Sequence, residues 1–168
     1  AKRISSVNGT HGEVDWTPIR YLNKGFSQTV LAGFYRAARV GVVTPFYDGM
    51  NLVAKEYVAA QNPHDPGVLI LSKFAGAANE LEAALLVNPH DTDAMARAMA
   101  TALAMPLPER RMRWDAMMTR LRGNTIHHWF TNFMTALDDT RISDVLIGGK
   151  QPVVTLQPNK TRNSAALH

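Results

Sequence analysis

Residues 40–56 read VGVVTPFYDGMNLVAKE, and this stretch decides the fold. Residues 40–44 form a short apolar run rich in β-branched side chains, and Pro45 follows it. A turn of small and polar residues comes next, and residues 52–61 then have the composition of a helix. A strand, a turn and a helix in that order predict one βα unit of a parallel sheet.

The start of that helix is a place where a phosphate group can bind. The backbone N–H groups of a first helical turn have no intrahelical partner, and the helix dipole adds about half a positive charge there. Asp48 and Asn51 add polar side chains at the rim, and Glu56 lies about one turn inside the helix. The same residues also fit a plain βα turn, since Asp-Gly is a common turn pair and Asn a common N-cap. Spacing alone leaves both interpretations open.

Strand and helix signals alternate on both sides of this unit, and helices follow one another after Pro89. Ser27 and Asp91 are expected N-caps. We predict strands over residues 17–23, 40–44, 68–71 and 83–87, and helices over residues 27–39, 52–61, 92–105, 109–122 and 125–137. The predicted fold class is α/β, with a parallel sheet, flanking helices and a helical C-terminal segment.

Composition narrows the class of protein. The 168 residues are 46% apolar and 19% charged, as in an ordinary globular domain, and none is a cysteine. No apolar run approaches the ~20 residues of a membrane span, so no membrane partner is expected. A cytoplasmic location is the prediction that fits the lack of cysteine.

The net charge of +4 raises the possibility of nucleic-acid binding, but the basic residues do not support it. The densest basic stretch, residues 110–122, also carries apolar residues at helical spacing, so we expect an amphipathic helix whose arginines mostly face solvent. No histidine pair has the i, i+4 spacing of a metal site. We therefore predict no nucleic-acid partner, no metal and no cofactor.

Thr44-Pro45 and residues 48–57, DGMNLVAKEY, closely resemble the donor loop of the trehalose-6-phosphate synthase family. These enzymes are retaining glycosyltransferases that use UDP-glucose. The resemblance extends over residues 6–137. It includes upstream Asn8-Gly9, residues 16–18 and 21–23 and Phe26, and downstream residues 58–61, 66–69, Ser72, 74–78, 87–89 and Trp129.

The resemblance implies part of the Rossmann-like C-terminal domain of a GT-B glycosyltransferase. Residues 1–137 would form a partial UDP-glucose-binding domain, and residues 138–168 a loose tail. Because the chain begins at Ala1 within a family segment, it is expected to be a fragment. Its partner would be the N-terminal half of the enzyme, and a homo-oligomer is possible.

The resemblance also implies a site and a reaction. The UDP-glucose site would comprise Phe26, Asp48, Gly49, Met50, Asn51, Leu52, Val53, Ala54, Lys55 and Glu56. Asp48 is the residue expected to have a catalytic role. The N–H groups of Leu52 and Val53 would bind the diphosphate and Glu56 the ribose diol, with Phe26 beside the uracil.

The family transfers glucose to glucose 6-phosphate with retention, and the leaving phosphate oxygen takes the acceptor proton, so neither a protein nucleophile nor a metal is implied. Phe46 and Tyr47 depart from the leucine and arginine often found there. The basic residues that grip the diphosphate lie upstream of this chain, so the chain alone is expected to be inactive. Two alternatives stay open: a synthase of another phosphorylated glucoside, such as glucosylglycerol phosphate, and a non-catalytic module for sugar-nucleotide binding or interaction.

Overall fold

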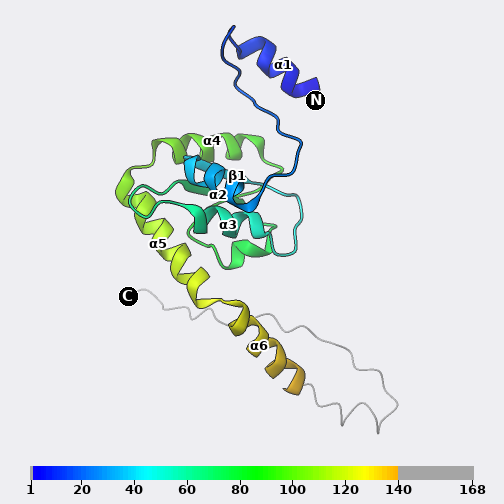
Figure 1. Ribbon diagram of the computed structural model, residues 1–168, viewed down its shortest axis with the longest axis vertical. Helices are drawn as coiled ribbons and strands as arrows, with labels where there is room; N and C mark the ends of the chain where they lie inside the picture. Colours follow the sequence, from blue (N-terminus) through cyan, green and yellow to red (C-terminus); the bar gives the residue numbers. More distant parts are fainter. Residues whose placement is uncertain (1, 140–168) are drawn as a thin grey trace, which may run out of the picture. The chain divides into compact units, whose positions relative to one another are not determined.

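The computed structural model describes residues 2–139, which divide into two units between Gly123 and Asn124. Figure 1 shows the elements in chain order. They are α1 (Lys2–His11), α2 (Gln28–Ala37), β1 (Val40–Val43), α3 (Leu52–Ala60), β2 (Val68–Ser72), the 3-10 helix η1 (Gly76–Asn79), β3 (Leu85–Val87), α4 (Thr92–Ala104), α5 (Leu107–Gly123) and α6 (Ile126–Asp139).

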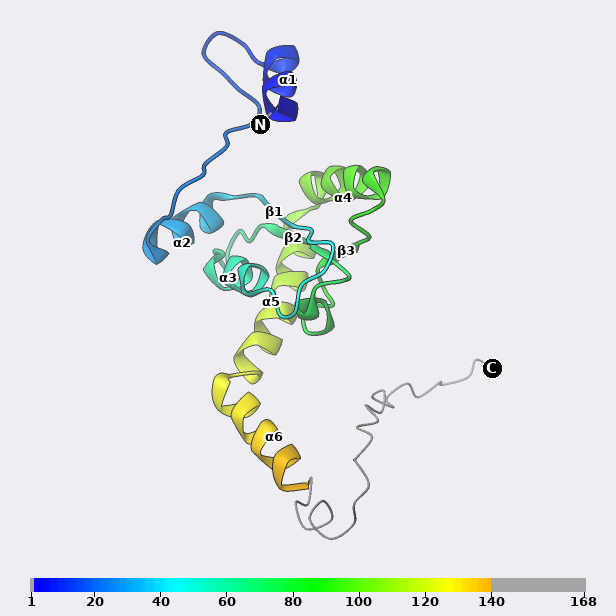
Figure 2. The same ribbon diagram turned by 90° about the vertical axis from the view of Figure 1, so that its right-hand side faces the viewer.

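The centre of the first unit is a three-stranded parallel sheet in the order β1-β2-β3 (Figure 2). Val40 pairs with Val68 in register, and Ile70 pairs with Leu85. Every residue of β2 is buried, whereas both neighbouring strands keep more exposed positions. This continuous apolar strand is typical of a parallel sheet covered on both faces.

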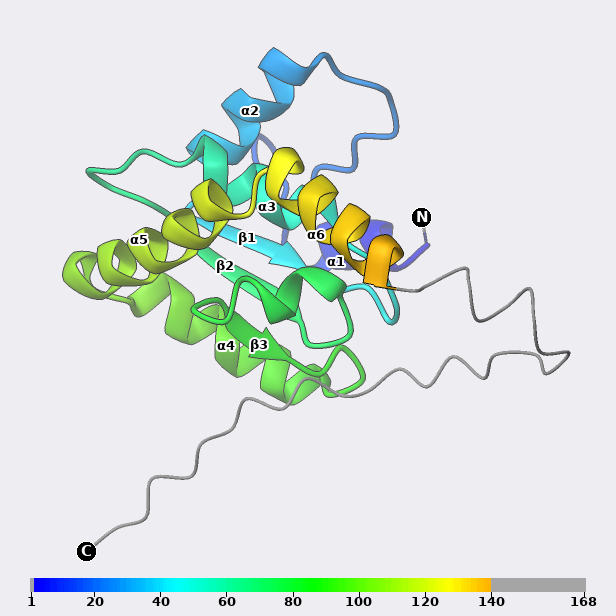
Figure 3. The ribbon, with the colours of Figure 1, turned by 90° about the horizontal axis from the view of Figure 1, so that it is seen from below.

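Helices cover both faces of the sheet (Figure 3). Because the side chains of a strand alternate between the two faces, successive residues of β2 belong to two different cores. Leu69 and Leu71 belong to a core that includes residues of α3, η1 and α5. Val68 and Ile70 belong to a second core with residues of α4. The predicted α/β class is therefore confirmed, and so are the predicted strands of the sheet apart from residues 17–23.

The local signals at two helix starts are also confirmed. The Ser27 hydroxyl accepts a hydrogen bond from the Val30 N–H at 3.4 Å, and the Asp91 carboxylate accepts one from the Ala94 N–H at 2.8 Å. Both side chains satisfy an amide that the helix itself leaves unpaired.

The predicted strand over residues 17–23 is wrong, because this segment has no regular secondary structure. The Asn8 side chain instead pairs with both backbone groups of Ile19: Nδ2 donates to the carbonyl at 2.8 Å, and Oδ1 accepts from the N–H at 2.9 Å. Asn8 lies on α1, a helix that the sequence analysis did not predict. A side chain thus takes the place that a neighbouring strand would fill.

The arginines of α5 mostly face solvent, as predicted: Arg111, Arg120 and Arg122 are exposed, whereas Arg110 is buried. Trp114 and Met117 are buried in the core, and Arg110 is buried with them at 7% exposure. Its guanidinium donates to the Asp65 carboxylate at 2.6 Å and to the Pro66 carbonyl. A hydrogen bond from Arg110 is the main reason why the pKa of Asp65 is lowered. Arg110 therefore fixes the turn that leads into β2.

The second unit is described as far as α6. Several of its large apolar side chains are exposed, and the Trp129 ring stacks on Phe133 at 5.3 Å. The predicted tail, residues 138–168, lies outside the described residues except for Asp138 and Asp139, which end α6. No helix within residues 2–139 is both long enough and apolar enough to span a membrane.

Candidate functional site

The turn between β1 and α3 is organised by Asn51. Its backbone is left-handed, with φ 67°, and its Oδ1 accepts a hydrogen bond from the Ala54 N–H at 2.9 Å. Its Nδ2 donates to the Asp48 carboxylate at 2.9 Å. The predicted N-cap is therefore confirmed. The N–H groups of Leu52 and Val53, which precede the capped amide, have no intrahelical partner, and these two residues are 58% and 45% exposed.

The same turn lies directly against η1. The Gly76 N–H donates to the Asp48 carbonyl at 3.2 Å, and the Ala77 N–H donates to the Met50 carbonyl at 2.8 Å. A Cβ atom on Gly76 would lie 1.8 Å from the Gly49 carbonyl oxygen, so only glycine fits here. The sequence analysis did not predict this contact, because residues 48–50 and 76–77 are more than 25 positions apart.

The side chains of the predicted site residues have different surroundings. Gly49 and Met50 are exposed, and Asp48 and Asn51 are half-buried. The Ala54 side chain is fully buried in the core. Lys55 forms a salt bridge with Glu80 at 2.7 Å. The exposed residues of the turn and of the helix start are therefore Gly49, Met50, Leu52 and Val53.

Glu56 lies in a separate hollow between α2 and α3, with a volume of about 500 Å³. Its lining residues are Phe26, Gln28, Leu31, Ala32, Tyr35, Glu56, Ala59 and Ala60. Apolar side chains and one carboxylate make this hollow suitable for a ligand with a flat or apolar part and hydroxyl groups. Sequence reasoning identified Phe26 and Glu56 but missed the α2 residues between them.

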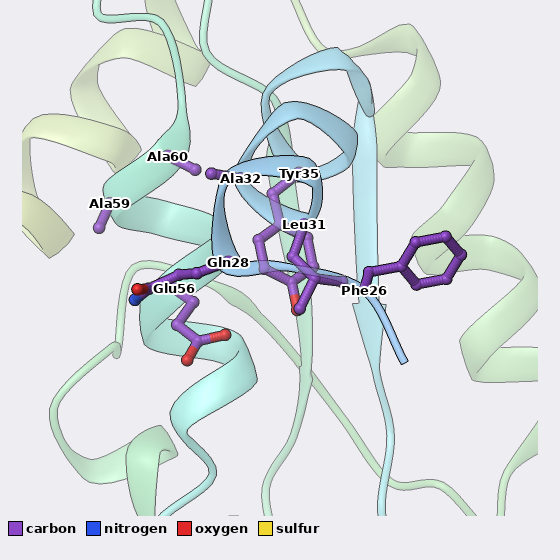
Figure 4. Close-up of a pocket in the computed structure, with 8 residues that line it drawn as sticks. All are labelled: Phe26, Gln28, Leu31, Ala32, Tyr35, Glu56, Ala59 and Ala60. Atoms are coloured by element: carbon purple, nitrogen blue, oxygen red, sulfur yellow. The ribbon is translucent and has the colours of Figure 1, made fainter. Parts of the chain in front are cut away.

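Within the hollow, Phe26 does not face Glu56. Its ring points away from the carboxylate (Figure 4) and packs edge-on against Phe34, with ring centroids 5.2 Å apart. The Lys24 ammonium lies 5.1 Å from the centre of the Phe26 ring. The structure thus brings Phe26 and Glu56 into one pocket but leaves the ring at its margin.

The helix start and the hollow are linked through α3. Leu52 and Glu56 are four residues apart, so they lie on the same side of the helix and about 6 Å apart along its axis. Unpaired N–H groups suit a phosphate, and a carboxylate suits a pair of sugar hydroxyls. One face of α3 therefore presents groups that match both a phosphate and a neighbouring sugar.

Aromatic side chains gather beside the turn at the carboxyl ends of the strands, where ligands bind in open α/β sheets. The Phe46 ring lies 4.7 Å from the His90 ring, and Phe74 lies 6.2 Å from His90. Tyr47 is 87% exposed. The sequence singled out Phe46 and Tyr47 but did not show that Phe74 and His90, which follow β2 and β3, lie beside Phe46. Within residues 2–139, no group of three or more His, Asp or Glu side chains is placed to hold a metal ion.

Comparison with known proteins decides the family. The model of glycosyltransferase family 20 matches residues 1–139, which include the turn, α3 and the hollow. The chain belongs to glycosyltransferase family 20. The predicted family and the GT-B Rossmann-like fold class are thereby confirmed.

Curated relatives of this glycosyltransferase family 20 chain are trehalose-6-phosphate synthases. One from Sinorhizobium fredii is 56% identical over 142 residues, which are 83% of this chain and 31% of the relative. One from an Enterobacter species is 58% identical over 134 residues, which are 80% of this chain and 28% of the relative. The chain thus spans about 30% of the length of the relatives it matches.

Solved structures give the same result. The chain is 55% identical to a UDP-forming α,α-trehalose-phosphate synthase from Burkholderia xenovorans in complex with glucose-6-phosphate. The match has a TM-score of 0.79 and covers 82% of this chain and 30% of the other. An E. coli structure bound with UDP-2-fluoro glucose is 51% identical, with a TM-score of 0.78, over 81% of this chain and 30% of the other.

Proposed function

We propose that this chain carries the donor-binding part of a retaining glycosyltransferase. The whole enzyme would transfer glucose from UDP-glucose to glucose 6-phosphate and so make trehalose 6-phosphate. The observation that carries the proposal is the shared face of α3, where the N–H groups of Leu52 and Val53 and the Glu56 carboxylate lie together. The names of the relatives and the ligands of the solved structures support it.

Each part of the donor has a matching group in this proposal. The diphosphate lies at the start of α3, where N–H groups and the helix dipole stabilise the charge that builds up as the bond to glucose breaks. The ribose diol donates to Glu56, and the uracil lies in the hollow that Phe26 borders. Asp48, held by Asn51, accepts a hydrogen bond from a glucose hydroxyl and so positions the reacting sugar.

The remaining parts of the reaction need groups outside this chain. The chain spans about 30% of its relatives, and the acceptor site and the basic residues for the diphosphate are expected from the N-terminal half of the enzyme. We therefore propose donor binding without turnover for the chain alone. A cytoplasmic location and a homo-oligomer stay predictions.

Calorimetric titration of the 168-residue chain with UDP tests the proposal. We expect saturable binding that Glu56→Ala weakens about tenfold, which corresponds to about 1.4 kcal/mol. Glu82→Ala is the matched control, because Glu82 is an exposed carboxylate that does not line the hollow. Circular dichroism checks that all three proteins are folded. A folded wild-type chain that does not bind UDP, or equal weakening by both substitutions, would show that the donor site is not where we place it.

A further inference from the structure

Tyr35 shares the hollow between α2 and α3 with Glu56. Tyr35 comes from α2 and Glu56 from α3, and both side chains extend toward the same opening (Figure 4). The phenol hydroxyl of Tyr35 is a single donor at the end of a rigid ring, directed to the side of the pocket where the carboxylate lies. Neither the sequence motifs nor the comparisons assign this residue a role.

Tyr35 contacts two buried residues of the core side, Tyr57 and Gln61. It packs edge-on against Tyr57, with ring centroids 6.4 Å apart, and Tyr57 is only 3% exposed. The Gln61 side chain donates to the carbonyl oxygens of both Tyr35 and Tyr57, and its own oxygen accepts from the Gly67 N–H at 2.8 Å. The Gln61 hydrogen bond thus holds the Tyr35 backbone, and the Tyr57 ring supports one side of the Tyr35 ring in the position where its side chain lines the pocket.

The surroundings of the hydroxyl keep it protonated. Burial raises the pKa of Tyr35, and the charge of Glu56 and a hydrogen bond to its carboxylate raise it further. A tyrosine hydroxyl is protonated at neutral pH even at its ordinary pKa, so it is a hydrogen-bond donor there. Glu56 is exposed, and a free glutamate side chain samples several rotamers, which costs free energy when a ligand requires one of them. A donor that already holds the Glu56 carboxylate in one orientation lowers this ordering cost. The carboxylate can still accept hydrogen bonds from a ligand, because its two oxygens accept more than one hydrogen bond.

We propose that Tyr35 is a positioning residue: its hydroxyl holds one Glu56 oxygen so that the carboxylate is already oriented to accept a vicinal diol of a bound ribose. This inference rests on the proposed function, because the diol is that of a nucleoside diphosphate. Tyr35 acts through Glu56 and does not itself contact the ligand's diphosphate. The expected consequence is selectivity for a complete ribose.

Two probes separate this role from general binding: UDP, and 2′,3′-dideoxy-UDP, which lacks the diol. We expect Tyr35→Phe in the 168-residue chain to lower the preference for UDP over the dideoxy compound about fivefold, the size of one ordinary hydrogen bond. Affinity for the dideoxy compound should stay unchanged. In the Glu56→Gln background the same substitution should have no further effect on the preference.

Tyr57→Phe is the matched control, because it removes the hydroxyl of the adjacent buried tyrosine on the same pair of helices. It should alter stability without altering the preference for UDP. If Tyr35→Phe leaves the preference unchanged while wild type prefers UDP, or if Tyr57→Phe changes it equally, the role of Tyr35 is overturned and the proposed function stands.

An NMR titration of Tyr35 without any ligand completes the test. Glu56→Gln should lower the pKa of Tyr35, and Glu82→Gln should not. An unchanged Tyr35 titration in Glu56→Gln overturns the contact itself. A folded wild-type chain that binds neither nucleotide overturns both the proposed function and the ribose role, which distinguishes that failure from the failure of Tyr35 alone.

Discussion

Replacing Gly76 by alanine tests whether the turn before α3 is shaped by η1. The added Cβ would lie 1.8 Å from the Gly49 carbonyl oxygen and 3.0 Å from its carbonyl carbon. Both atoms are backbone, so no side chain can rotate away and residues 48–50 must move. Such overpacking costs about 1–3 kcal/mol. The movement also weakens the hydrogen bonds from Gly76 and Ala77 to the turn, each worth about 1 kcal/mol.

The expected loss of unfolding free energy is therefore about 3 kcal/mol, which lowers the urea midpoint by roughly 1.5 M for an m-value of about 2 kcal/mol/M. Urea titration followed by circular dichroism measures it. Gly33→Ala is the control, because a Cβ there meets no atom within 4 Å and the residue is exposed in α2. It should raise stability by up to about 1 kcal/mol. If Gly76→Ala keeps the wild-type midpoint, the turn does not depend on η1.

Two further substitutions address the start of α3 and the buried tyrosine. Asn51→Ala should cost about 2 kcal/mol in urea titrations, since it removes the N-cap and leaves a left-handed residue with a Cβ. Asn51→Gly should cost less than about 1 kcal/mol, and equal costs would contradict the left-handed turn. Burial raises the pKa of Tyr57 from 10.0 to about 12, so the folded state favours the protonated phenol. Its contribution to stability is complete below pH 10 and is lost as the pH rises toward 12. Tyr57→Phe should therefore flatten the fall in urea midpoint between pH 10 and pH 12, and an unchanged slope would assign that fall to other groups.

The elements that local sequence predicted are those whose causes are local. The apolar run of β2, the N-caps Ser27, Asn51 and Asp91, and the helix boundaries that follow them depend on residues within a few positions of one another. Side-chain periodicity and capping act over one or two turns of chain. These predictions are confirmed for that reason.

The strand wrongly predicted over residues 17–23 and the unexpected burial of Arg110 both depend on partners distant in the sequence. The expected strand over residues 17–23 failed because Asn8, 11 positions before Ile19, took over the backbone groups of that residue. Arg110 is the buried member of a set of arginines that mostly face solvent as predicted, and Asp65 and Pro66, more than 40 positions earlier, supply the partners that allow its burial. Composition and spacing within one helix carry no information about such partners.

The sequence by itself determined the βα unit, the cap on α3 and, through its motif, the family, because each is encoded in contiguous residues. The conformation of the turn and the pocket beside α3 depend on tertiary packing. Packing of η1 against the turn fixed its backbone through Gly76, and packing of α2 beside α3 brought Tyr35 and Glu56 into one hollow. These contacts join segments about 20 to 30 positions apart, and their geometry exists only after the sheet has formed and its helices have closed over it.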